Sequence, residues 1–206
     1  MQLESYRSTT DPLELCVPVF PSLVSARHAT KSADTIWTGA GSGVVLCDST
    51  HVKVHADGSN PAGGQAPQAM GRTKGGLNTK IHAVVNARSQ AIVIALSSGN
   101  EADITLAEEL TECLPEDSTL IGDKAYDSSA LRQTATAKGV KTCIPGRTNR
   151  TTTVPFSAKL YRRRHRIENF FQKIKRYRRV ATRYDKLAET FFGFICFAIL
   201  LTLRLT

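Results

Sequence analysis

The sequence has few of the features that mark secreted, metal-clustered or membrane proteins. Its five cysteines are scattered and form no CxxC pair, which argues against a zinc site or a disulfide framework and for reduced thiols in a cytosolic protein. The N-terminus lacks the basic-then-apolar pattern of a signal peptide. The strongly apolar run at 191–203 has only 13 residues, too short to span a bilayer comfortably, and we predict a buried C-terminal helix there.

Acidic residues are nearly absent from one part of the chain. Residues 158–183 contain eleven Lys and Arg and a single acid, Glu168, so this window carries +10 while the whole chain carries +9. A nearly neutral body with one concentrated basic element indicates a polyanionic partner. The 206 residues, 41% of them apolar and 22% charged, are enough for one domain with a substantial core.

The order of elements predicts an α/β fold. Residues 1–40 read as an irregular or partly disordered segment, and a domain over 41–206 begins with a short apolar strand that ends at Asp48 and is followed by an alternating continuation. A Gly-rich loop over 57–76 leads to a hairpin of strands at 79–88 and 91–99. The further predicted elements are a helix at 100–114, a strand ending at Asp123, a helix at 129–139 capped by Asp127 or Ser128, a strand at 140–146, a basic helix at 157–179 and an apolar helix at 184–204. Three strands as a meander, followed by βα units, give a mixed sheet with flanking helices and a C-terminal helical pair.

Four side chains of the basic helix are spaced to share one face. Tyr161, Arg164, Glu168 and Lys175 are separated by three, four and seven residues, which return to nearly the same direction at roughly 100° per residue. A carboxylate inside a nucleic-acid-binding surface is what a metal-dependent phosphoryl-transfer enzyme needs.

Three acids could meet in one crevice. Asp48 and Asp123 each end a predicted strand, and Glu168 lies on the helix that follows the sheet. Ligands of α/β sheets are usually bound at the carboxyl ends of strands, so neighbouring strands would bring Asp48 and Asp123 together. Clustered carboxylates repel one another unless they bind hard cations, which predicts Mg²⁺ or Mn²⁺, with two ions acting on a phosphodiester.

Each acid also has a simpler interpretation. Asp48 and Asp123 could be turn or cap residues, Asp127 an N-cap, and Glu168 a surface partner of Arg164 contributing at most about 0.5 kcal/mol. Arg72, Lys74 and Lys80 could either follow a DNA backbone or be solvated loop charges. His51, His55 and His82 alternate along strands, and we interpret them as structural or DNA-facing residues.

These blocks resemble the DDE-type transposases of bacterial insertion sequences, in particular the insertion sequence four/five-like group. That group's signature of Tyr, two residues, Arg, three residues, Glu, six residues and Lys is met by Tyr161, Arg164, Glu168 and Lys175. CDSTHVKVHA around Asp48, the Gly-rich segment GGQAPQAMGRTKGGLNTKIHAVV and GDKAYDS around Asp123 are similar too. The resemblance covers about residues 43–204.

The resemblance implies a ribonuclease-H-like fold and a site of Asp48, Asp123 and Glu168 as catalytic metal ligands. It implies metal-dependent cleavage at element ends and transfer of the freed 3′-hydroxyl to target DNA. DNA, as terminal repeats and target, is the expected partner, with a homodimer when two ends are paired and a cytoplasmic, nucleoid-associated location. Arg164 and Lys175 would hold phosphates, and Tyr161 would stack on a displaced base.

One departure leaves alternatives open. Members of the group normally carry a helical region of about a hundred residues before the first acid, whereas 47 residues precede Asp48 here. The hypotheses are therefore an active transposase, a truncated product that binds DNA and inhibits transposition, and a structure-directed nuclease of the same fold.

Overall fold

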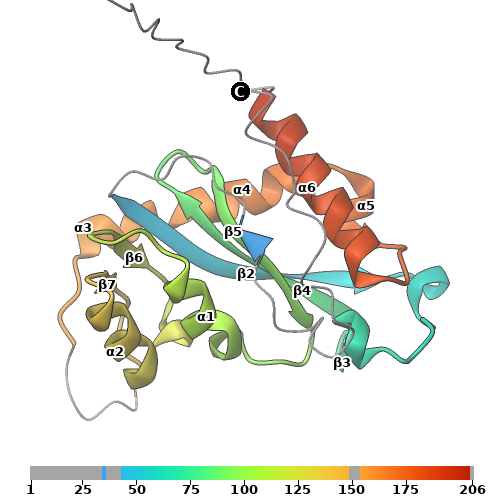
Figure 1. Ribbon diagram of the computed structural model, residues 1–206, viewed down its shortest axis with the longest axis horizontal. Helices are drawn as coiled ribbons and strands as arrows, with labels where there is room; N and C mark the ends of the chain where they lie inside the picture. Colours follow the sequence, from blue (N-terminus) through green and yellow to red (C-terminus); the bar gives the residue numbers. More distant parts are fainter. Residues whose placement is uncertain (1–33, 36–42, 149–153, 205–206) are drawn as a thin grey trace, which may run out of the picture.

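The computed structural model describes residues 34–35, 43–148 and 154–204 (Figure 1). Its core is a mixed sheet in the order β1-β5-β4-β2-β6-β7, with β3 also paired to β4 and β8 to β2. The strands are β1 (Asp34–Thr35), β2 (Val44–Val54), β3 (Gly71–Thr73), β4 (Gly76–Asn86), β5 (Ala91–Ser98), β6 (Thr119–Ile121), β7 (Lys141–Cys143) and β8 (Thr182–Arg183). Strands β2, β4 and β5 pair antiparallel, whereas β6 and β7 add in parallel on the other side of β2.

Helices cover both faces of this sheet (Figure 1). The α-helices are α1 (Ala107–Glu112), α2 (Ser129–Ala137), α3 (Ala158–Tyr161), α4 (His165–Ile174), α5 (Arg178–Ala181) and α6 (Ala188–Arg204). Short 3₁₀ helices occupy Ala56–Gly58, Ala66–Gln68, Asp103–Leu106, Lys124–Tyr126 and Arg162–Arg164. The α/β class predicted from the element order is confirmed.

The two faces of the sheet have separate apolar layers. Leu46 and Val52 of β2 pack with Ile167, Phe170 and other residues of α4 and α6. On the opposite face, residues of β2, β4 and β5 pack against α1 and α2, with Val45, Cys47, Leu110 and Leu131 among them. Because side chains alternate along a strand, Asp48 and Thr50 face α4, whereas Ser49 and His51 face the other way.

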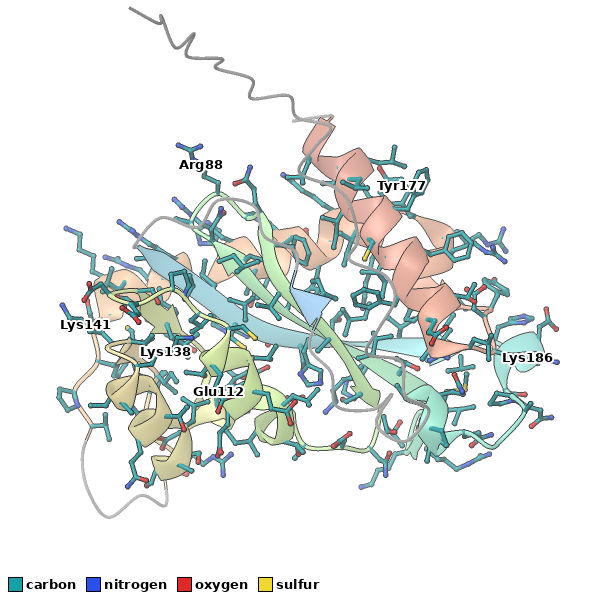
Figure 2. The ribbon with its side chains drawn as sticks, viewed as in Figure 1. Arg88, Glu112, Lys138, Lys141, Tyr177 and Lys186 are labelled. Carbon is teal, nitrogen blue, oxygen red and sulfur yellow. The ribbon has the colours of Figure 1, made fainter. Side chains whose placement is uncertain are left out.

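Helices α1 and α2 pack together in the apolar layer on one face of the sheet. Ser128 caps α2 by accepting a hydrogen bond from the Leu131 amide, which confirms one of the two predicted caps. The Lys138 ammonium donates to the carbonyl of Glu112 at the end of α1, and Figure 2 shows these two side chains beside each other. The predicted helix over 100–114 is shorter than expected, because residues 103–106 form a 3₁₀ turn and α1 begins only at Ala107.

Three predicted boundaries were wrong. The first strand does not end at Asp48 but continues to Val54, because it pairs with β4 up to Lys53 and with β8. The predicted loop at 57–76 contains strand β3, which lies between β2 and β4 in sequence and pairs with β4, while β2 and β4 remain direct neighbours in the sheet. The predicted basic helix at 157–179 is broken by a 3₁₀ turn at 162–164 and again after Ile174.

The prediction for residues 1–40 lies outside the described residues, apart from Asp34 and Thr35, which pair with β5. Over the described ranges, the helices include none that is both long and apolar enough to cross a membrane. Within the described ranges, Cys47, Cys113 and Cys143 form no disulfide.

Candidate active site

Asp48 lies where one edge of β2 is open. On that edge β6 pairs with Val44–Leu46 and β8 pairs with Lys53 and Val54, so between them no strand of the described chain bonds to β2. Asp48 is thus in a gap rather than at a strand terminus. The Ser49 amide donates to Asp48 Oδ1 at 2.9 Å. The carboxylate therefore supplies the hydrogen-bond acceptor that a neighbouring strand would otherwise provide for this backbone N–H.

The register of the sheet directs Asp123 to the same gap. Leu46 pairs with Ile121 in the parallel β2–β6 ladder, and Asp48 and Asp123 each follow two residues later. Neighbouring strands are about 4.8 Å apart, so the two backbones leave this ladder side by side. Asp123 is half-buried and its Oδ1 accepts the Ala125 amide at 2.8 Å, which caps the 3₁₀ turn that follows.

Arg164 joins Asp48 to Glu168. Its Nη2 donates to Asp48 Oδ2 at 3.0 Å and its Nη1 to Glu168 Oε1 at 2.5 Å. The Asp48 side chain is 15% exposed and that of Glu168 is 50% exposed. The Arg164 guanidinium therefore binds two of the three predicted acids, Asp48 from β2 and Glu168 from α4, and its positive charge lies between them.

Lys175 fastens the other end of α4 to the same strand. Its Nζ donates to Thr50 Oγ1 at 2.7 Å and to the His51 carbonyl at 2.8 Å, and burial lowers the pKa of this ammonium. The His51 carbonyl belongs to the unpaired stretch of β2, so a side chain replaces the missing strand there. The predicted motif thus has three members in contact with β2 or with each other.

Electrostatics distinguish Asp48 from an ordinary surface carboxylate. Burial raises the pKa of Asp48 to about 6, although Arg164 and the Ser49 amide both lower it. The nearby negative charges of Asp123 and Asp103 raise this pKa further. Asp123 is therefore near enough to influence Asp48 directly.

The donor set fits a hard divalent cation. No group of three His, Cys, Asp or Glu side chains in the described ranges is already close enough to hold an ion. However, Asp48 and Glu168 already share a cationic partner, and Asp123 repels Asp48 from the adjacent strand. Carboxylate oxygens around a position that attracts positive charge are the ligands that Mg²⁺ and Mn²⁺ prefer.

The remaining predicted DNA contacts differ in accessibility. Arg72 and Lys74 are exposed on and beside β3. Lys80 is only 5% exposed, and its ammonium bonds to Asp103 at 2.7 Å and to the Glu101 carbonyl. Lys80 therefore has an internal partner, which is a correction to its predicted place along a DNA backbone. Tyr161 is half-buried against the core and packs edge-on to Phe156.

The basic run is also divided. Six of its members are exposed: Lys159, Arg162, Arg163, Arg176, Arg178 and Arg179. Arg183, in contrast, is fully buried, bonds to Thr79 Oγ1 at 2.7 Å, and has its pKa lowered to about 10 by burial. Charge counting alone could not separate this structural arginine from the surface ones.

Sequence reasoning missed Asp103 and Ser49. Asp103 lies within the stretch predicted as a helix at 100–114, and its Oδ1 accepts from Ser49 Oγ at 2.8 Å and from Lys80. Burial raises the pKa of Asp103, but the hydrogen bonds from Lys80 and Ser49 outweigh this and hold the pKa below its ordinary value. Ser49 follows Asp48 directly, and this adjacency was the available signal.

A mixed sheet with acids on a central strand, just after an adjacent parallel strand and on a covering helix is an arrangement that suits metal-assisted phosphoryl transfer. Comparison with known proteins gives the family. A model described as "Transposase DDE domain" matches residues 39–203, and the chain belongs to this family. It is 38% identical over 121 residues to a Brucella ovis protein named "Putative transposase for insertion sequence element IS6501", covering 58% of this chain and 92% of that protein.

The family resemblance drawn from the sequence blocks is therefore confirmed. Membership implies a transposase that acts on DNA and cleaves it with the help of divalent metal ions.

Proposed function

We propose that this protein is a transposase that cuts DNA at the ends of an insertion element and joins the freed 3′-hydroxyl to target DNA. The observation that carries the proposal is the Arg164 bridge between Asp48 and Glu168, with Asp123 directed to the same gap by the β2–β6 register. Family membership supports the reaction class.

Asp48, Asp123 and Glu168 would hold Mg²⁺ or Mn²⁺, with two ions as the expected number. Bound metal lowers the pKa of an attacking water or hydroxyl and stabilises the leaving oxygen of the phosphodiester. Arg164 would then release the carboxylates and donate its planar fork to a phosphate, a partner of similar geometry. Lys175, at the far end of α4, would contact the next part of the backbone, and Tyr161 a displaced base.

The DNA would lie along the exposed basic residues of the α3–α5 segment. Arg72 and Lys74 would extend this surface beyond the open edge of β2. We assign the catalytic domain to 41–206, with the sheet order β5-β4-β2-β6-β7 as its ribonuclease-H-like core. Pairing of two element ends would require a homodimer, and the protein would act at the bacterial nucleoid.

The test is a Mg²⁺-dependent cleavage and joining assay on DNA that carries element ends. Asp123→Ala should abolish both products, while Glu116→Ala, which removes an exposed acid before β6, should leave them unchanged. If wild type and Asp123→Ala both shift DNA but are equally inert, the protein is a binding product and the enzyme proposal fails. Cleavage without joined target would indicate a nuclease of the same fold.

A further inference from the structure

A polar layer lies behind Asp48, on the face of the sheet opposite α4. It contains Ser49, Lys80, His82, Ser97 and Asp103, and four of these side chains come from strands β2, β4 and β5. Lys80 is 5% exposed and His82 fully buried, so the layer is internal rather than a solvated surface. The assigned catalytic acids do not include any of its members.

Two hydrogen bonds converge on one oxygen of this layer. Asp103 Oδ1 accepts from Ser49 Oγ at 2.8 Å and from Lys80 Nζ at 2.7 Å. The Asp103 side chain is 28% exposed and that of Lys80 is 6% exposed, so solvent screens the pair only in part. Asp103 therefore holds the hydroxyl of Ser49 in one position.

Ser49 transmits this constraint to Asp48. Its backbone amide donates to Asp48 Oδ1 at 2.9 Å, on the strand edge that has no ladder partner. A free strand edge can twist, and the orientation of that amide then depends on what holds the Ser49 side chain. The sequence of contacts is Lys80, Asp103, Ser49 and finally the carboxylate of Asp48.

The loop that carries Asp103 is itself fixed against the sheet. The Gly99 amide donates to the Asn78 carbonyl at 3.1 Å, and His51 Nε2 lies 3.1 Å from the Gly99 carbonyl. A Cβ on Gly99 would lie 2.6 Å from Asn78 Cβ, so this close approach requires glycine. The segment from Gly99 to Asp103 thus contacts β2 at His51 and at Ser49, whose side chains lie on the same face of the sheet.

We infer that Asp103, anchored by Lys80, is a positioning residue that acts through Ser49 to orient the carboxylate of Asp48. A buried ion pair rarely adds net stability over apolar residues of the same size, so its place directly behind the first acid indicates a geometric role. Groups that orient metal ligands change metal affinity by about 10- to 100-fold when they are removed. The expected effect on metal affinity rests on the proposed function, whereas the orientation of the Asp48 carboxylate by Ser49 and Asp103 does not.

The experiment measures two properties of the whole chain, neither of which is catalysis. Amide hydrogen exchange at residue 49 is followed by NMR, and Mn²⁺ affinity by electron paramagnetic resonance. Ser49→Ala should speed exchange at residue 49 by about tenfold and weaken Mn²⁺ binding by about tenfold. Ser49→Thr, which keeps the hydroxyl, should restore both.

A matched control and a second variant separate positioning from loss of stability. Ser97→Ala removes another buried hydroxyl of the layer, which bonds His82 Nε2 at 2.8 Å, and should change neither property. Asp103→Ala leaves the Lys80 ammonium without its carboxylate and could unfold the chain, so it is made together with Lys80→Met. This double variant should reproduce Ser49→Ala.

The possible results have distinct meanings. Unchanged exchange and Mn²⁺ affinity in Ser49→Ala would overturn the inference, and so would an equal effect of Ser97→Ala. If the wild type binds no Mn²⁺ and cuts no DNA while Ser49→Ala still speeds exchange at residue 49, the proposed function fails and the positioning role stands.

Discussion

Two arginines of this protein hold carboxylates in opposite ways. Arg132 of α2 directs both Nε and Nη2 to Asp127 Oδ1, at 3.1 and 2.9 Å, and also bonds Thr142 Oγ1 and the Ile144 carbonyl. The Asp127 side chain is 1% exposed, and its other oxygen accepts the Arg147 amide. Arg164 instead divides its fork between Asp48 and Glu168, and its buried Nε has no partner within the described residues.

The difference indicates which clamp can change partners. The Arg132 clamp ties α2, β7 and the loop at Arg147 together, and opening it would leave several buried groups without hydrogen bonds. The Arg164 clamp contains a half-exposed acid and an incompletely bonded guanidinium, so a divalent cation and a phosphate could replace its two contacts at low cost. Burial and completeness of bonding, rather than the presence of an ion pair, separate the structural clamp from the convertible one.

The largest expected effect tests the structural clamp. Asp127→Ala should lower the free energy of unfolding by about 3–5 kcal/mol, because it strands a largely buried guanidinium. Glu168→Ala should lower it by less than about 1 kcal/mol, because a half-exposed ion pair contributes little. Urea unfolding followed by circular dichroism measures both, and equal losses would contradict the distinction between the two clamps.

Local signals in the sequence predicted the elements on which both clamps rest. The Ser128 cap, the β4–β5 hairpin and the strand before Asp123 each depend on a few neighbouring residues, and each is present. Asp48 and Asp123 were expected to converge because both were assigned to strand ends. The convergence follows instead from the β2–β6 register, since Asp48 lies inside a longer strand.

The partners of the site residues could not be read from the sequence. Arg164 and Asp48 are 116 residues apart, and Ser49 and Asp103 are 54 apart, so nothing local links them. The helical face proposed for Tyr161, Arg164, Glu168 and Lys175 assumed one regular helix, but a 3₁₀ turn at 162–164 separates α3 from α4. Contacts between residues far apart in the sequence therefore determine that Arg164 could exchange its partners and that Lys80 is buried.

The second prediction concerns the pH dependence of the convertible clamp. The pKa of Asp48 is raised to about 6, above the roughly 3.9 of an unfolded aspartate. The folded state therefore binds more protons between these values, and stability falls as pH rises from about 4 to above 6, by up to about 3 kcal/mol. Asp48→Asn should remove this fall, as measured by urea unfolding at a series of pH values; a parallel decline in the variant would assign it elsewhere.

The third prediction concerns Arg164 itself. Arg164→Gln should destabilise the metal-free protein by about 1–2 kcal/mol, because two charge-assisted hydrogen bonds are lost. Mn²⁺ should raise the melting temperature more in this variant than in the wild type, since the ion no longer has to displace a guanidinium. Arg163→Gln removes an exposed arginine from the same turn and is the control. A smaller Mn²⁺ effect in Arg164→Gln than in Arg163→Gln would mean that Arg164 helps to hold the ion rather than competing with it.

The smallest expected effect is that of replacing Lys175, and it tests whether the contacts of this lysine are structural, as at Arg132, or exchangeable for DNA, as proposed for Arg164. Its ammonium is half-buried and bonds Thr50 and the His51 carbonyl, so Lys175→Met should cost about 1 kcal/mol in urea unfolding. If these contacts are convertible, as at Arg164, the variant should also bind DNA several-fold more weakly than Lys173→Met, which removes the same charge from the same helix. A loss of stability with DNA affinity equal to that of Lys173→Met would place Lys175 with Arg132, as a fastening between α4 and the open edge of β2.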